Sequence, residues 1–374
     1  MTLQDAYALE TNFLASLQKL VEIESPTHDK AACDRLADHL EQRLLADGWQ
    51  VERLKQSEVG DQLVAVMGEG KGDSLLLCHY DTVWPVATLK TMPLSLRMAS
   101  VMVRVVDMKA GINLALHALE QIKAQGRRLR GKVTLLLSSD EETGSQHSRE
   151  LIERLALEHE RVLVLEPCKD DGALKIGRKG TAGYQLTFQG KSAHAGNNPK
   201  DGASALRELA HFLFFVEALG DEEAATSANL TVAKGGSVSN VIAEEARAQV
   251  DVRVLKLEEF TRIDRAVKGY HPQDARVSLD ISGGLNRPPL EPTPVNLRLF
   301  KEAQVKAEAL GLKLEGAVVG GGSDGNFTSA LGVATLDGLG GAGAGPHARH
   351  EHIRIADTLD RLALLVALLS AEMQ

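Results

Sequence analysis

Histidines and carboxylates stand directly after apolar runs of this chain, at spacings that suit a metal centre. His79 and Asp81 follow the apolar run 75–78, so the imidazole could bind an ion while the carboxylate orients the ring. Glu141 and Glu142 follow another such run. One of two adjacent glutamates can bind an ion while its neighbour acts as a general base toward water.

Three further residues have the same chemistry. Glu166 ends an apolar run, Asp107 precedes a helical pattern, and His347 follows the glycine-rich patch 338–345. Nitrogen and oxygen ligands without thiolate suit zinc, manganese or cobalt at a hydrolytic site. Two ions roughly 3.5–4 Å apart, sharing one carboxylate, would polarise a carbonyl and supply hydroxide near neutral pH. Taken singly, Asp107 could be a helix-start carboxylate and His347 an ordinary loop histidine.

An alternation of strands and helices must position these residues. Buried strands are predicted where short apolar runs occur, at 62–67, 74–78, 132–138 and 161–165. Helices are predicted where apolar residues recur at helical spacing, over 1–20, 30–46 and 110–124. This order indicates an α/β fold with a mainly parallel sheet and flanking helices. Ligands bind beyond the carboxyl ends of strands in such sheets, where the polar residues above are expected to meet.

The pattern changes between residues 179 and 287. Alternating strands are predicted at 184–189, 229–232 and 246–254, with a helix over 202–219. The chain of 374 residues is too long for one core. We therefore expect a catalytic domain of residues 1–178 and 288–374, interrupted at 179–287 by a smaller α+β domain with an antiparallel sheet.

Composition excludes several classes of function. A net charge of −9 argues against a nucleic-acid partner, because phosphate binding needs a basic surface. No apolar run approaches the roughly 20 residues of a membrane span, and the N-terminal stretch lacks the pattern of a signal peptide. The three cysteines form no CxxC pair, which fits a reducing cytoplasm.

Seven short motifs occur in one order along nearly the whole chain. They are His79-Tyr80-Asp81-Thr82-Val83, Asp107-Met108-Lys109, Asp140-Glu141-Glu142-Thr143-Gly144-Ser145, Glu166-Pro167, Ser192-Ala193-His194-Ala195-Gly196, Ser239-Asn240 and Gly345-Pro346-His347. The set resembles the co-catalytic zinc metallopeptidases, a family of glutamate carboxypeptidases, succinyl-diaminopimelate desuccinylase, acetylornithine deacetylase and aminoacylases. The chain is most similar to the glutamate carboxypeptidase branch, and the resemblance implies a zinc-exopeptidase-like fold.

The resemblance also implies a ligand set. His79 and Glu166 would bind one divalent ion, Glu142 and His347 would bind a second, and Asp107 would bridge the two. Two ions per subunit are expected, with zinc favoured and cobalt or manganese as alternatives.

By the same resemblance, Asp81 orients His79 and Glu141 is the general base that activates a metal-bound water. The inserted domain would form a homodimer or a lid. His194 would reach the partner subunit's site and stabilise the oxyanion of the tetrahedral intermediate.

Three further positions match substrate contacts of the family. Asn240 and Arg253 would hold a substrate carboxylate, the arginine through its bidentate fork. Gly321, within the run 320–324, would supply a backbone amide. Arg253 alternates along a predicted strand and could equally be a surface residue.

Three functions stay open at this stage. The first is a metallo-carboxypeptidase that releases a C-terminal amino acid from a small peptide. The second is an N-acyl-amino-acid deacylase, which cleaves the same kind of amide beside a free carboxylate. The third is a non-catalytic relative, impaired at residues 97–106.

The stretch 97–106 departs from the family pattern. Relatives carry a Tyr-Gly-x-Gly turn there, whereas this chain has valines and no glycine. Codons for residues 98–105, read from one base earlier, can spell Asp-Gly-Leu-Arg-Tyr-Gly-Pro-Gly, which contains the missing turn. We infer a compensated frameshift, in the recorded sequence or in the gene, which resequencing would distinguish.

Overall fold

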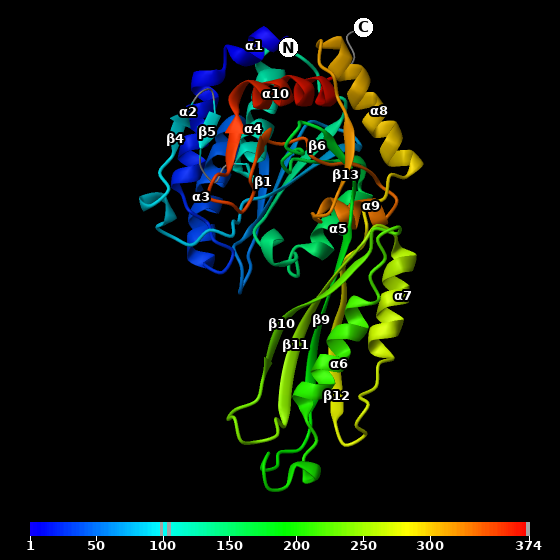
Figure 1. The fold of residues 1–374 in the computed structure, drawn as a ribbon. Coiled ribbons are helices and arrows are strands. Elements are labelled where there is room, and N and C mark those ends of the chain that lie inside the picture. Colours follow the sequence, from blue (N-terminus) through cyan, green and yellow to red (C-terminus); the bar gives the residue numbers. More distant parts are fainter. Residues whose placement is uncertain (98–99, 103–105, 372–374) are drawn as a thin grey trace. The chain divides into compact units, whose positions relative to one another are not determined.

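The computed structural model describes residues 1–97, 100–102 and 106–371, and the chain divides into two compact units (Figure 1). The first unit comprises Met1–Gly177, Pro292–Val319 and Ser323–Gln374. The second comprises Arg178–Glu291 together with Gly320–Gly322. The second unit thus extends a few residues beyond the expected insert at 179–287 and takes in a glycine tripeptide from the later part of the chain.

A six-stranded sheet forms the centre of the first unit. Its order is β1 (Gln50–Leu54), β2 (Gln62–Met67), β6 (Lys132–Ser138), β3 (Gly72–His79), β7 (His159–Val164) and β14 (Ala334–Leu336). The last four strands are parallel, and β1 and β2 add an antiparallel edge. In the register, His79 lies opposite Ser138, and Leu77 opposite Val164. The carboxyl ends of β3, β6 and β7 therefore meet at one edge, which confirms the mainly parallel sheet.

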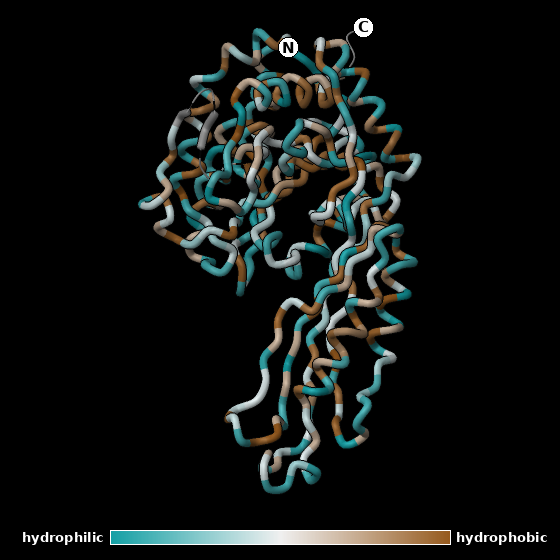
Figure 2. Tube along the Cα trace, in the orientation of Figure 1, coloured by the Kyte–Doolittle hydropathy of each residue, from teal (hydrophilic) through white to brown (hydrophobic). Residues whose placement is uncertain are grey.

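Helices cover both faces of this sheet. They are α1 (Leu3–Tyr7), α2 (Glu10–Glu22), α3 (Lys30–Asp47), α4 (Lys109–Ala124), α5 (Arg149–Leu157), α8 (Pro294–Ala309), α9 (Gly325–Ala330) and α10 (Ile355–Leu369). Leu76 and Cys78 of β3 pack into a large core with α2, α3, α4 and α10. Leu75 and Leu77 face a second core with α5 and α9. The alternation of side chains along a strand accounts for both cores, and Figure 2 shows the hydrophobic residues along α10.

The expectation of one helix over 1–20 was wrong. The segment forms α1 and α2 with a break at Ala8 and Leu9, since α1 packs against α10 while α2 packs against α4. Tyr7 also donates a hydrogen bond to Asp360 at 2.7 Å. Tertiary packing on two different helices therefore overrides the continuous apolar pattern.

Smaller elements complete the first unit. β13 (Gly316–Val319) pairs with β8 (Leu174–Arg178), and a second sheet has the order β15 (Gly343–Ala344), β16 (His352–Arg354), β5 (Ser100–Met102) and β4 (Ser95–Arg97). Short 3-10 helices occur at η1 (Thr88–Lys90) and η2 (Glu141–Thr143). In the part of the chain that the structure describes, no helix is long and apolar enough to cross a membrane.

The second unit is an antiparallel sheet with two helices on one face, of which the sequence predicts the antiparallel sheet and the first helix. The order is β10 (Ser227–Gly235), β11 (Glu245–Val254), β9 (Gly180–Gln189) and β12 (Ser278–Arg287). Alternate residues of β9 and β11 are buried against α6 (Ala205–Glu217) and α7 (Leu257–Lys268). The 3-10 helix η3 (Pro199–Asp201) precedes α6, and β10 lies at the edge of the sheet.

Candidate active site

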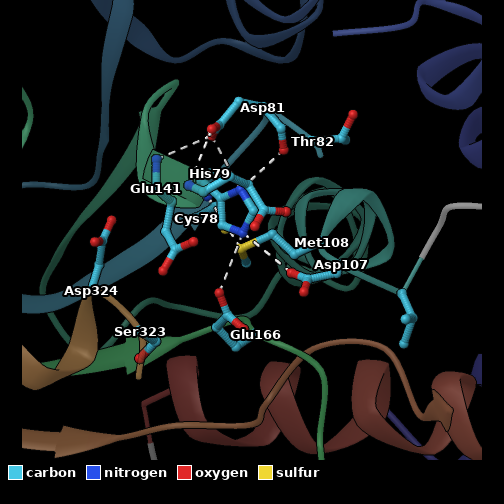
Figure 3. A network of polar contacts seen from close by, with 12 residues as sticks. Cys78, His79, Asp81, Thr82, Asp107, Met108, Glu141, Glu166, Ser323 and Asp324 are labelled. Carbon is cyan, nitrogen blue, oxygen red and sulfur yellow. Dashed lines mark hydrogen bonds and ion pairs between the residues drawn. The ribbon is translucent and has the colours of Figure 1, made fainter. Parts of the chain in front are cut away.

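The first group of candidate metal ligands surrounds His79, at the carboxyl end of β3. Its Nε2 atom lies 3.3 Å from Oδ1 of Asp107 and 3.3 Å from Oε1 of Glu166. Figure 3 shows both carboxylates converging on this ring. Glu166 follows β7 and Asp107 stands just before α4, so the ends of two adjacent strands and the start of a helix supply the group.

A second group surrounds His347. Its Nε2 atom lies 3.3 Å from Oδ2 of Asp107 and 3.1 Å from Oε2 of Glu142. Within each group, the candidate ligand atoms lie within 4.8 Å of one another. Asp107 belongs to both groups and directs one oxygen toward each histidine. Two imidazoles, two terminal carboxylates and one shared carboxylate form a donor set that fits two divalent ions.

The charges of the two groups are coupled. Burial lowers the pKa of His79, but its contacts with Asp107, Asp81 and Glu166 outweigh burial and raise it overall. Contacts with Asp107 and Glu142 raise the pKa of His347 to about 11. The surrounding carboxylates therefore favour the protonated form of both imidazoles in the metal-free protein. A divalent ion binds neutral imidazole, so it must displace these protons.

Asp81 fixes the ring of His79 and the turn that carries the glutamate pair. Its carboxylate lies 3.2 Å from Nδ1 of His79 and accepts a hydrogen bond from the Thr27 hydroxyl at 2.7 Å. It also accepts the backbone N–H groups of Glu141 (3.4 Å) and Glu142 (3.3 Å). Thr27, which sequence reasoning missed, has no local signal, because its partner is 54 positions away in the chain.

The half-buried Glu141 stands beside the second group on η2. Among the described residues, neither ligand group includes Glu141. Asp140 holds the turn by accepting the backbone N–H groups of His147 (2.7 Å) and Ser148 (3.3 Å). Adjacent glutamates on one short helix thus have different surroundings, as a ligand and a base require.

Glu351 is a second residue that sequence reasoning missed. Its buried carboxylate accepts the backbone N–H groups of Val106 at 3.0 Å and Asp107 at 3.4 Å, and the indole N–H of Trp84 at 3.2 Å. Burial, and then the neighbouring charge of Asp107, raise the pKa of Glu351 to about 7. Glu351 therefore holds in place the backbone of Asp107, the residue whose carboxylate the two ligand groups share.

Two glycines hold the strand end before Glu166. A Cβ atom at Gly111 of α4, or at Gly340, would lie 2.0 Å from the carbonyl oxygen of Leu165. The N–H of Gly340 donates to the Glu166 carbonyl at 2.9 Å. Only glycine allows this close approach on both sides. The glycine-rich patch 338–345 is thus, at Gly340, a packing surface for the end of the strand that carries Glu166.

The expected substrate contacts all lie in the second unit, whereas both ligand groups lie in the first. His194 is exposed, and its Nδ1 atom accepts the backbone N–H groups of Gly196 (3.1 Å) and Asn197 (3.0 Å). The carbonyl of Asn240 accepts the N–H of Ala195 at 2.9 Å, which brings the His194 and Asn240 segments together.

Arg253 and Gly321 have contacts within the same unit. The guanidinium of Arg253 forms a bidentate pair with Asp251, with Nε–Oδ1 at 2.9 Å and Nη2–Oδ2 at 2.8 Å. The carbonyl of Gly321 accepts a hydrogen bond from Arg178 Nη1 at 3.2 Å.

The frameshift hypothesis falls partly outside the described residues, which omit 98–99 and 103–105. Val106 and Asp107 are described, with the Glu351 contacts given above.

Comparisons with known proteins place this geometry in a family. A family model described as a peptidase dimerisation domain matches residues 176–277. The chain is 31% identical over 369 residues to carboxypeptidase G2 of Pseudomonas sp. (strain RS-16), covering 95% of this chain and 88% of that protein. The chain belongs to the M20 peptidase family.

Other M20 proteins are similar over nearly the full length. Succinyl-diaminopimelate desuccinylase of Alkalilimnicola ehrlichii is 30% identical over 377 residues, covering 94% of this chain and 97% of that protein. The fold matches a tripeptidase from Staphylococcus aureus subsp. aureus mu50 with a TM-score of 0.84 at 23% identity, covering 96% and 97% of the two chains. The resemblance inferred from the motifs is confirmed, and the chain is a metal-dependent M20 amidohydrolase.

Proposed function

We propose that this M20 protein is a dinuclear amidohydrolase that releases a C-terminal amino acid from a small peptide, as a metallo-carboxypeptidase does. The observation that carries the proposal is the placement of Asp107, whose two carboxylate oxygens each lie 3.3 Å from a different histidine. The similarity to carboxypeptidase G2 over 95% of the chain supports the carboxypeptidase form.

The residues divide the chemistry among them. His79 and Glu166 would hold one ion, Glu142 and His347 the other, and Asp107 would bridge both. Divalent ions, zinc by preference and cobalt or manganese as alternatives, would polarise the scissile carbonyl and lower the pKa of a water molecule.

Proton transfer falls to Glu141, beside Glu142 and outside both ligand groups. Glu141 takes a proton from the attacking water and passes it to the nitrogen of the leaving amino acid. Asp81, 3.2 Å from Nδ1 of His79, keeps that imidazole oriented for an ion on its Nε2 atom.

The second unit would supply substrate contacts and a homodimer interface. Its helix α6 exposes Leu206 and Phe214, the latter with 73% of its surface free, next to the edge strand β10. Exposed apolar residues beside an unpaired strand edge favour pairing with a second copy of the chain. Across that interface, His194 would stabilise the oxyanion in the partner subunit's site.

Recognition of the substrate carboxylate would fall to three positions. Asn240 and Arg253 would bind it, and Gly321 would add a backbone amide. Arg253 would then exchange its bidentate partner Asp251 for the substrate. We place the enzyme in the cytoplasm, in keeping with its three cysteines, all free and buried.

Deacylation of an N-acyl amino acid is the second candidate. The same groups would perform it, and the similarity to a desuccinylase over 94% of the chain favours it. A panel of N-acyl amino acids and α- and γ-glutamyl peptides, with added zinc, cobalt or manganese, separates the two candidates by which class of substrate is cleaved.

The same panel tests the mechanism. Glu141→Gln should keep the bound metal and lose roughly 10²–10⁴-fold in turnover, the usual contribution of a general base. The exposed Glu150→Gln on nearby α5 is the control. A wild-type protein that binds metal yet cleaves nothing would be a non-catalytic relative, and a fully active Glu141→Gln would remove this residue from its role.

A further inference from the structure

A pocket of about 470 Å³ adjoins the second ligand group within the first unit. The segments 26–29 and 82–86 form its walls, together with Glu142 and Thr143. The carboxylate of Glu142 is also 3.1 Å from Nε2 of His347. One residue therefore belongs to both the ligand group and the pocket wall.

The pocket wall is mainly apolar. Pro26, Val83, Pro85 and Val86 line it, and Val83 and Val86 leave 44% and 48% of their surfaces free. A single exposed valine is common on protein surfaces. Two valines and two prolines gathered beside a metal-ligand group instead resemble the apolar lining of a small-molecule site.

Every ionisable side chain in the described pocket wall is either a carboxylate or an imidazole. Asp29 and Glu142 carry carboxylates and His28 carries an imidazole. None of the described lining residues is lysine or arginine. Asp29 is fixed, since its carboxylate caps α3 by accepting the Ala32 N–H at 2.9 Å. With Glu142 committed to an ion, Asp29 remains as a fixed negative charge, and the described lining offers no lysine or arginine to pair with a ligand carboxylate.

The walls are held together before any ligand binds. The N–H of Thr27 donates to the Thr82 carbonyl at 3.2 Å, and the N–H of Thr82 donates to the Ser25 carbonyl at 2.9 Å. The Thr27 hydroxyl reaches Asp81, which also orients His79. The pocket is thus preformed and fixed to the ligand group that it adjoins.

These observations indicate which half of the substrate the pocket receives. Cleavage at the metal groups leaves an acyl half and an amino acid, and the amino acid carries a free carboxylate. We propose, on the basis of the function above, that this pocket is the acyl subsite and selects an uncharged, apolar acyl group. Acyl groups that end in a carboxylate, such as succinyl, are poor substrates.

Two glutamate derivatives test the proposal, N-pentanoyl-glutamate and N-succinyl-glutamate. Their acyl chains have similar length and differ in the terminal carboxylate. The wild-type enzyme should show the higher kcat/KM for the pentanoyl compound. Val86→Lys places a cation in the half-exposed wall and should shift the ratio of the two kcat/KM values toward succinyl by roughly two- to five-fold.

A second variant and a control complete the design. Asp29→Asn keeps an N-cap side chain and removes one negative charge, so it should shift the ratio in the same direction by a few-fold. Val305→Lys on α8, at a valine with 53% of its surface free, should leave the ratio unchanged.

The outcomes are distinct. Hydrolysis with a ratio that neither Val86→Lys nor Asp29→Asn moves, or a wild-type preference for succinyl, overturns the acyl subsite and leaves the amidohydrolase intact. Failure to cleave either compound or any substrate of the wider panel, with metal bound, overturns the proposed function itself.

Discussion

Replacing Glu351 tests how far its hydrogen bonds support Asp107, while the candidate metal ligands themselves stay unchanged. Glu351→Leu leaves three N–H groups without their acceptor, on Val106, Asp107 and Trp84. A buried donor without a partner costs about 1–3 kcal/mol. Only the Val106 contact is fully buried, and the Asp107 contact is long at 3.4 Å, so we expect a total loss of about 2–4 kcal/mol in the free energy of unfolding.

The effect on metal binding should be larger than stability alone implies. Groups that orient ligands typically contribute about 10–100-fold in metal affinity. Glu351→Gln retains an acceptor oxygen for Val106 and Asp107 and loses the bond to Trp84 at 3.2 Å. Since burial and Asp107 raise the pKa of Glu351 to about 7, an uncharged amide is tolerated there. The glutamine variant should stay within roughly three-fold of wild-type affinity, the effect of a fraction of one hydrogen bond.

Competition with a chromogenic chelator measures the affinities, and chemical denaturation of the metal-free proteins measures stability. Glu308→Gln and Glu308→Leu, at an exposed position of α8, are the controls. Equal metal affinity in Glu351→Leu and wild type, with the protein folded, would refute the supporting role.

Two further predictions concern the proposed dimer interface and the protons on the two candidate metal-binding histidines. His194→Ala and Glu141→Gln should each lower kcat. Mixing the two kinds of subunit should restore part of the activity, because a hybrid dimer contains one intact site, and verified hybrids without recovery would exclude a role across the interface. Ion binding should strengthen from pH 6 to pH 8 with proton release, because the pKa values of His79 and His347 are raised in the metal-free protein and a proton competes with the ion. Calorimetry in buffers of different ionisation enthalpy measures that release, and an affinity independent of pH would contradict it.

Strands buried on both faces could be predicted almost to the residue. The runs 62–67 and 132–138 coincide with β2 and β6, because continuous apolar residues bounded by polar ones have few other uses in an α/β chain. That the candidate metal ligands lie close together could also be predicted, from the direction of the strands. Once the sheet is parallel, the carboxyl ends of β3, β6 and β7 must share an edge; His79 ends β3, and Glu142 and Glu166 come shortly after β6 and β7.

Residues that act through long-range contacts could not be predicted. Glu351 contacts Val106 from 245 positions away, and Thr27 contacts Asp81 from 54 positions away, so neither has a periodic or local signal. The pair between Arg253 and Asp251 was equally invisible, because alternation along a strand shows only that both side chains share a face.

Titration of the metal-free protein with zinc tests the central claim most directly, namely that Asp107 joins two metal sites. Wild type should bind about two ions per chain, whereas Asp107→Asn should lose tight binding of at least one, and the exposed Asp170→Asn should match wild type. A wild-type protein that binds at most one ion, or an Asp107→Asn protein that binds two as tightly as wild type, would contradict the shared-carboxylate centre.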